Sequence, residues 1–251
     1  MPRAAIVLAL ACLVAVSCAG NGDDRARSRA TTASTTAAPT TAAPTTAVPT
    51  AVSPTTVAVT GPPTFDGGVE AIPDAARLHA SWRPGCPVPL EDLRVLSLDH
   101  WGLDGAEHRG ELVVHADHAD AIVGVFRRLF EARFPIERME LVDAFGADDD
   151  AVMVANDTSA FNCRDVVGRP GVWSQHAYGL AVDVNPLVNP YVLSPEDVRP
   201  PEGVAYLDRT QDVAGLIRGG DVVVEAFAAI GWEWGGVWDM PDYQHFSAAG
   251  N

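Results

Sequence analysis

Hydrophobic side chains recur at helical spacing in two segments of the chain. Within residues 119–133 the apolar positions that share one helical face are Ile122, Phe126, Leu129 and Phe130. Because residues three and four apart lie on one side of a helix, this spacing predicts a helix that Asp117 caps and that Phe134-Pro135 ends. A second helix is predicted to start near Asp221 and to stop at Gly231.

Shorter apolar runs predict strands. We expect them at 111–115, 138–143, 151–154, 179–184 and around 243–246. Alternation in the fourth run places Leu180, Val182 and Val184 toward a core, and Ala181, Asp183 and Asn185 on the opposite face. These strands and helices follow no regular βαβ rhythm, and the sequence has no glycine-rich phosphate loop. The prediction is an α+β fold with a small, mostly antiparallel sheet and flanking helices.

The N-terminus is typical of an export signal. Arg3 precedes an apolar run over residues 4–16, which is too short to span a bilayer. The run ends in small residues before Cys18, resembling a bacterial lipobox, although Ala15 stands where leucine is usual. We therefore predict a signal peptide over 1–18 and a lipid anchor on Cys18 that holds the exported protein at the cell-wall side of the membrane. Ordinary secretion is the alternative.

Composition divides the rest of the chain into two parts. Residues 30–63 are almost entirely Thr, Ala, Pro and Val, with no charge after Arg29 and no aromatic residue before Phe65. Such a segment buries too little apolar surface to offset its ordering entropy. We expect a disordered, semi-stiff stalk over 19–63. Residues 64–251 are long enough for one domain with a core of its own.

Cysteines and charge restrict the function further. Cys12 lies in the predicted signal peptide, so Cys86 and Cys163 remain in the exported domain, where a disulfide is the first expectation. A nucleophilic or zinc-binding role for Cys163 is the less favoured alternative. The formal net charge is −16, and all 17 basic residues are arginine. So acidic a protein is not expected to bind nucleic acid.

The candidate chemistry lies in the C-terminal third. His176 and Asp183 are seven residues apart around Gly179, and Asp242 precedes His245 by three positions. Two imidazoles and one carboxylate can hold a catalytic zinc ion with one position open for water. A further carboxylate can take the proton of that water. In a regular strand Asp242 and His245 would face opposite sides, so a turn or bulge must bring them together.

The other five histidines carry no partner motif. We expect them to be surface or hydrogen-bonded structural residues, namely His79, His100, His108, His115 and His118.

The two motifs together resemble a known family. They read Ser174-x-His176-x-x-Gly179-x-Ala181-x-Asp183 and Asp242-x-x-His245. This pattern is similar to that of the VanY-like zinc D-Ala-D-Ala carboxypeptidases and endopeptidases of bacterial cell walls. Segments 159–164, 185–191 and 231–236 resemble the endolysin-like branch. The resemblance implies the fold that this family shares with lysostaphin-type peptidases and hedgehog domains.

The resemblance also implies roles for single residues. His176, Asp183 and His245 would bind one zinc ion per domain, and Asp242 would be the general base. Arg164 would bind the substrate carboxylate or the developing oxyanion. Ser174 would shape the ligand loop or contact the substrate.

The function implied is zinc-dependent hydrolysis of D-Ala-containing stem peptides of peptidoglycan, with carboxypeptidase activity favoured. Three alternatives stay open: an endopeptidase of the same family, a non-catalytic wall-binding module on this fold, and a stalked lipoprotein for transport or adhesion.

Overall fold

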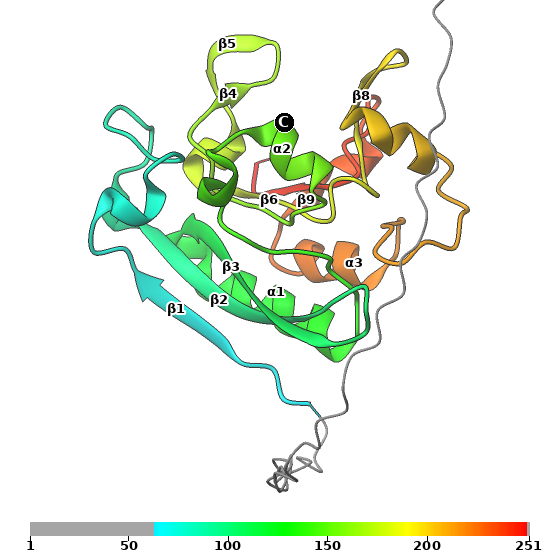
Figure 1. Ribbon diagram of the computed structural model, residues 1–251, viewed down its shortest axis with the longest axis horizontal. Helices are drawn as coiled ribbons and strands as arrows, with labels where there is room; N and C mark the ends of the chain where they lie inside the picture. The colour runs from blue at the N-terminus through cyan, green and yellow to red at the C-terminus, as the bar shows by residue number, and fades with distance from the viewer. Residues whose placement is uncertain (1–62, 250–251) are drawn as a thin grey trace, which may run out of the picture. The chain divides into compact units, whose positions relative to one another are not determined.

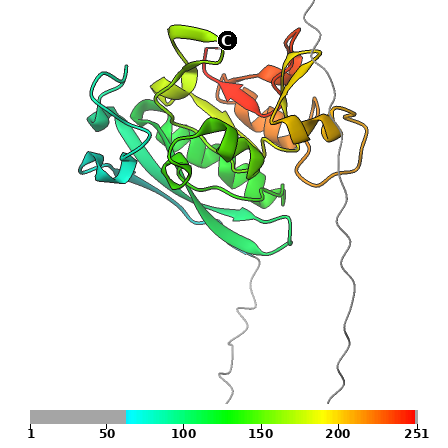
Figure 2. The same cartoon turned by 45° about the horizontal axis from the view of Figure 1, so that its top comes forward.

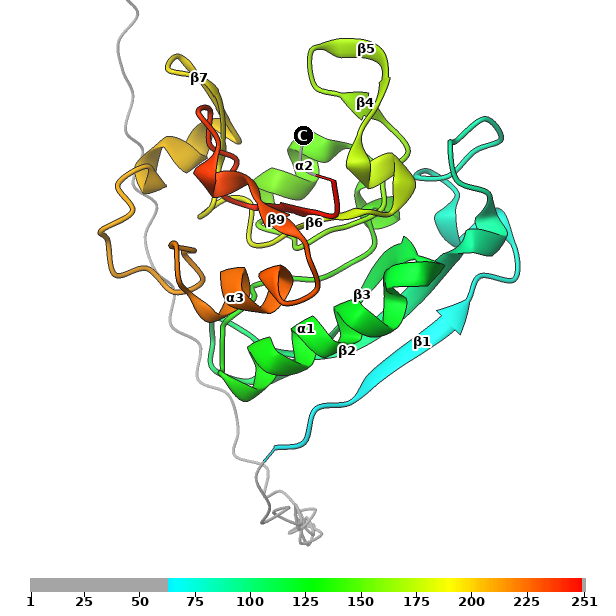
Figure 3. The same ribbon diagram turned by 180° about the vertical axis from the view of Figure 1, so that it is seen from behind.

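The computed structural model describes residues 63–249, shown from three directions in Figures 1, 2 and 3. The predicted signal peptide, the lipid site at Cys18 and nearly all of the predicted stalk lie outside these residues. None of the helices in the described part has the length and apolar character needed to cross a bilayer.

One antiparallel sheet is built from the first three strands in the order β1-β2-β3. They are β1 (Gly67–Ala71), β2 (Leu93–Trp101) and β3 (Glu107–His115). Helix α1 (Ala119–Glu131) packs along this sheet, chiefly on β2 (Figure 3). The buried face of α1 consists of Ala119, Ile122, Val125, Phe126, Leu129 and Phe130. This is the apolar stripe that the sequence predicts, and it forms the centre of the main core.

A second antiparallel sheet has the order β6-β10-β9. It consists of β6 (Ala181–Asp183), β10 (His245–Ser247) and β9 (Glu233–Trp234). Helix α3 (Val222–Ala228) packs against β9 and α1. The rings of Phe227 and Phe246 stack with centroids 4.2 Å apart, which joins α3 to the sheet. One continuous apolar core therefore supports both sheets.

Two hairpins stand beside helix α2 (Asp149–Val154), as Figure 1 shows. The first pairs β4 (Asp165–Val166) with β5 (Arg169–Trp173), and the second pairs β7 (Tyr191–Ser194) with β8 (Asp197–Arg199). Short 3-10 helices connect the elements: η1 (Ala75–Leu78), η2 (Leu90–Asp92), η3 (Ala116–His118), η4 (Val142–Phe145), η5 (Gln175–Tyr178), η6 (Pro201–Tyr206) and η7 (Gly235–Val237).

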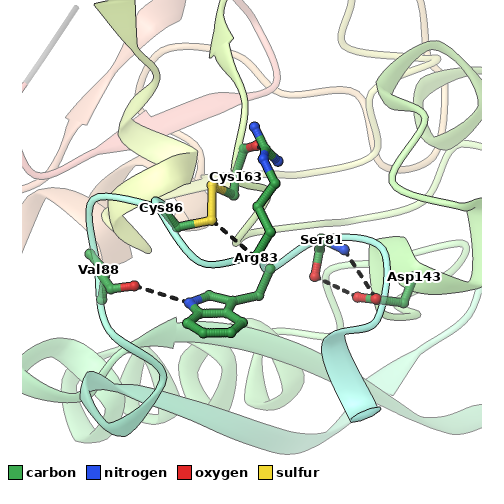
Figure 4. The surroundings of a disulfide bond; sticks show 7 residues. Ser81, Arg83, Cys86, Val88, Asp143 and Cys163 are labelled. Atoms are coloured by element: carbon green, nitrogen blue, oxygen red, sulfur yellow. Dashed lines mark hydrogen bonds between the residues drawn. A yellow bond between two sulfur atoms is a disulfide. The ribbon is translucent and has the colours of Figure 1, made fainter. Parts of the chain in front are cut away.

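A disulfide joins Cys86 to Cys163 across 77 positions of the chain (Figure 4). It fastens the loop before β2 to a second, smaller apolar cluster that includes Phe161. Hydrogen bonds hold the same loop. Ser81 Oγ donates to Asp143 Oδ2 at 2.6 Å.

The α+β fold with small antiparallel sheets and flanking helices is confirmed. Helices α1 and α3 and strands β3, β6 and β10 lie where the apolar pattern predicts them.

Three local predictions are wrong. Residues 138–143 make isolated backbone hydrogen bonds and then enter η4, so they form no strand. Residues 151–154 belong to helix α2, because the Asp148 side chain accepts from the backbone N–H groups of Asp150 and Ala151 and caps a helix there. Asp117 does not cap α1, whose N-cap is His118.

Candidate active site

His176 is placed by the tight turn η5. The Ser174 hydroxyl accepts from the His176 backbone N–H at 3.3 Å and starts the turn. Gly179 ends it at φ 67°, where a Cβ would lie 2.6 Å from the His115 backbone nitrogen. The Nδ1 atom of His176 lies 2.6 Å from the carbonyl oxygen of Ala160. A carbonyl can only accept, so Nδ1 carries the hydrogen and Nε2 keeps a lone pair for a metal.

Asp183 and His245 come from neighbouring strands. In the antiparallel pairing of β6 with β10 these two residues are direct partners. Asp183 is fixed from the other side as well, because its backbone exchanges hydrogen bonds with Ser159 at 2.8 and 3.0 Å. Directly opposite side chains share one face of a sheet, so Asp183 and His245 point to the same place.

The three side chains converge on one point. His176 Nε2 lies 3.2 Å from His245 Nδ1 and 3.1 Å from Asp183 Oδ2, and His245 Nδ1 lies 2.9 Å from Asp183 Oδ1. Ligand atoms of a tetrahedral zinc ion, each about 2.0 to 2.1 Å from the metal, lie roughly 3.3 to 3.4 Å apart. The three residues are 3 to 8 % exposed. Their spacing and chemistry therefore fit a buried metal ion.

The charges of the cluster support a metal ligand set. Burial disfavours the ionised form of Asp183, but His176 and His245 outweigh that effect, and the pKa of Asp183 lies well below its usual range. A carboxylate that stays ionised in a buried site is suited to a cation.

Asp242 reaches the same site through a turn. The backbone N–H of His245 donates to the Asp242 carbonyl at 3.3 Å, so 242–245 is not a regular strand. The Asp242 side chain is buried, and its Oδ1 has no hydrogen-bond partner among the described residues. Burial is the main reason that the pKa of Asp242 rises to about 7; His245 opposes the rise, and Asp183 adds to it.

Arg164 lies in the same pocket as the three candidate metal ligands. Its Nε donates to Asp149 Oδ1 at 2.8 Å, and its Nη1 lies 3.4 Å from the Asp165 carbonyl. The first residue of α2 thus holds the guanidinium group in place. The Arg164 charge also acts to lower the pKa of Asp242, which places the two groups near each other.

A family comparison agrees with this geometry. Residues 167–248 match the family model described as D-alanyl-D-alanine carboxypeptidase. Over this segment the chain is similar to that peptidase family. The matched segment contains the three candidate ligands and Asp242, while Arg164 lies before it. No curated protein and no solved structure was found to match the chain.

The pocket that contains the candidate metal ligands has a volume of about 210 Å³. Val172 and Trp173 of hairpin β4–β5 and Trp238 after η7 supply apolar lining. Tyr191 and Arg199 of hairpin β7–β8 supply polar lining. His176, Asp183, Asp242 and His245 therefore lie in one pocket with both apolar and polar lining.

Sequence reasoning did not find all the pocket residues. Tyr191 lies within a segment that resembles the family, yet its position beside Asp242 depends on a pairing across 51 residues that no local pattern reveals. Asp149 was not predicted as a pocket residue, because the sequence pattern predicts a strand over residues 151–154 and not a helix that begins at Asp149.

The remaining histidines and Cys163 are not among the residues that line this pocket. Within residues 63–249, the one group of three or more candidate metal ligands is His176, Asp183 and His245. His115 accepts from the Asp117 backbone N–H, and His118 accepts from Trp232 Nε1. Cys163 is in the disulfide.

Proposed function

We propose that the protein is a zinc-dependent peptidase that hydrolyses D-Ala-containing stem peptides of bacterial peptidoglycan, with carboxypeptidase activity favoured. The observation that carries this proposal is the convergence of His176, Asp183 and His245 on one buried point, with Asp242 in the same pocket. All four residues lie in the segment that matches the peptidase family.

The ligand set favours zinc. Nε2 of His176, Nδ1 of His245 and the Asp183 carboxylate are nitrogen and oxygen donors of the kind that hold catalytic zinc. When bound there, zinc supplies Lewis acidity, which polarises a carbonyl group and lowers the pKa of water to about 7. The Nδ1 hydrogen bond to Ala160 keeps the His176 ring oriented for this role.

Asp242 is the proposed general base. Its free Oδ1 takes a proton from water as the water oxygen bonds to the carbonyl carbon of the substrate. The carboxyl group then returns this proton to the leaving nitrogen as the C–N bond breaks. Burial excludes bulk water from the carboxyl group, and a pKa near 7 suits a group that must accept and release a proton.

Arg164 is the proposed anion-binding residue. The bonds to Asp149 and Asp165 use Nε and Nη1, which leaves Nη2 for the substrate. A guanidinium group binds a carboxylate strongly. A free C-terminal carboxylate is the feature that distinguishes a carboxypeptidase substrate, and Arg164 therefore favours that activity over internal cleavage.

The proposed location follows from the N-terminal sequence. A signal peptide over 1–18 and a lipid anchor on Cys18 would place the domain on the outer side of the membrane, next to peptidoglycan. The disulfide between Cys86 and Cys163 supports an oxidising compartment.

Hydrolysis of defined muropeptides tests the proposal. Zinc-loaded protein should remove the terminal D-Ala from a pentapeptide stem, with products identified by mass. Cleavage inside the stem instead would establish the endopeptidase alternative. Asp242→Asn should keep zinc and lose turnover. If the zinc-loaded wild type leaves every stem peptide intact, the wall-binding alternative is favoured.

A further inference from the structure

Tyr191 is the immediate neighbour of the proposed base. It forms an antiparallel bridge with Asp242. The flanking hydrogen bonds run from Val192 N to Pro241 O at 2.9 Å and from Tyr243 N to Pro190 O at 3.3 Å. This pattern defines a non-hydrogen-bonded pair, in which the Cα atoms lie about 4.5 Å apart and the side chains are closest. The phenol and the carboxyl group therefore leave the backbone side by side.

The surroundings of the Tyr191 ring are those of a substrate-binding group. Tyr191 lines the pocket that contains the metal ligands, and it is half-buried. Burial, with the Asp242 carboxylate adding to it, raises the pKa of Tyr191, while Arg169 and Arg164 oppose the rise. At neutral pH the phenol is therefore protonated and can donate a hydrogen bond.

The hydroxyl group has no protein acceptor. Within residues 63–249 no hydrogen bond joins it to another residue, although the nearby arginines and aspartates bond to one another. A purely structural tyrosine at a half-buried position usually bonds its hydroxyl to the protein. A donor that faces the pocket unpaired is available to a ligand.

We propose that Tyr191 is a catalytic residue that donates its phenolic hydrogen bond to the carbonyl oxygen of the cleaved bond as negative charge develops on it. This inference rests on the proposed peptidase function. Asp242 must lie next to the attacked carbon in order to move the proton, and the group beside Asp242 is then within reach of the oxygen on that carbon. A neutral phenol can donate a hydrogen bond to the developing oxyanion without placing a further charge beside Asp242.

Tyr191→Phe removes the hydroxyl and keeps the ring. The expected result is a fall in kcat of about 100-fold with little change in KM, as for loss of one oxyanion donor. Zinc content and thermal stability should match the wild type. Tyr206→Phe is the control, because Tyr206 lies in η6 outside the pocket lining. It should have wild-type kinetics.

Binding of a phosphinate analogue of D-Ala-D-Ala, measured by calorimetry, separates a catalytic role from a role in shaping the pocket. The phosphinate oxygens mimic the tetrahedral oxyanion, so Tyr191→Phe should weaken the analogue far more than it raises KM. Equal kcat and equal phosphinate affinity in Tyr191→Phe and an active wild type would overturn the role of Tyr191 alone. A rise in KM with unchanged kcat would also overturn it. A wild type that cuts no stem peptide would overturn the peptidase function itself.

Discussion

Asp183 and His245 face each other across the pairing of β6 with β10, and the Nδ1 of His245 lies 2.9 Å from the Asp183 carboxylate. The register of two short strands therefore sets the geometry of the candidate metal site. A slip by one residue would turn one of the two side chains to the other face of the sheet. Phe246, the residue after His245, points into the core and stacks on Phe227.

Gly179→Ala should distort the candidate metal site, because Gly179 ends the turn that places His176. The new Cβ would lie 2.6 Å from the His115 backbone nitrogen, and φ at this position is 67°. We expect a loss of stability of about 2 to 4 kcal/mol from the combined strain and clash, together with weaker metal binding because His176 shifts. Thermal unfolding with and without zinc measures both effects.

Gly220→Ala is the matched control for this substitution. Gly220 also has a positive φ, 86°, but a Cβ there meets nothing within 4 Å. It should cost about 1 to 2 kcal/mol, the strain of an L-residue in the left-handed region, and leave zinc binding unchanged. Equal effects of the two substitutions on zinc binding would contradict the role given to the turn.

Removal of the disulfide should lower stability substantially. The bond between Cys86 and Cys163 closes a loop across 77 positions, for which chain entropy gives about 4 to 5 kcal/mol. The double variant Cys86→Ser/Cys163→Ser should unfold at correspondingly lower denaturant concentration. If the variant and the oxidised wild type unfold at the same midpoint, the bond does not stabilise the domain.

Asp157 should make stability fall as the pH rises. It is fully buried, its Oδ1 accepts from the Glu140 N–H at 2.8 Å, and its Oδ2 has no partner in the described structure. Burial raises its pKa to about 7. The folded state prefers the protonated form of Asp157. Its contribution to the free energy of unfolding is therefore fully present below pH 4 and is lost as the pH rises to about 7. The shift corresponds to roughly 4 kcal/mol.

Asp157→Asn is the test. Asparagine keeps the acceptor for Glu140 and cannot ionise, so the variant should be more stable than the wild type at pH 8 and similar near pH 4. Asp143→Asn should instead be destabilising, because Asp143 accepts from the hydroxyl of Ser81 through Oδ2. Chemical unfolding at both pH values measures the free energy of unfolding of each variant. If Asp157→Asn were no more stable than the wild type at pH 8, the destabilising ionisation of Asp157 would be contradicted.

Short-range patterns in the sequence predicted the candidate metal ligands, whereas the other pocket residues depend on pairing between distant segments. The spacing around Gly179 and the Asp242-x-x-His245 motif indicate the three candidate ligands and Asp242 from the sequence alone. Tyr191 could not be found that way, because its role depends on which strand lies beside it.

In one segment, two local sequence signals predict different secondary structures. The apolar residues of 151–154 suit a strand, but the Asp148 cap starts a helix there, and that helix then carries Asp149 to Arg164. Residue propensities alone do not decide whether a helix-capping residue or an apolar strand pattern determines the local structure. The stripe of α1, by contrast, is long and strictly periodic, and the structure follows it.

The central claim is that His176, Asp183 and His245 hold one metal ion. Calorimetric titration of metal-free protein with zinc tests it most directly. The wild type should bind one ion per chain, and Asp183→Ala should bind at least about 100-fold more weakly, beyond the loss expected for an outer-shell partner. Asp239→Ala, which removes an exposed carboxylate three positions before Asp242, should bind like the wild type. Equal affinity of Asp183→Ala and the wild type would contradict the claim.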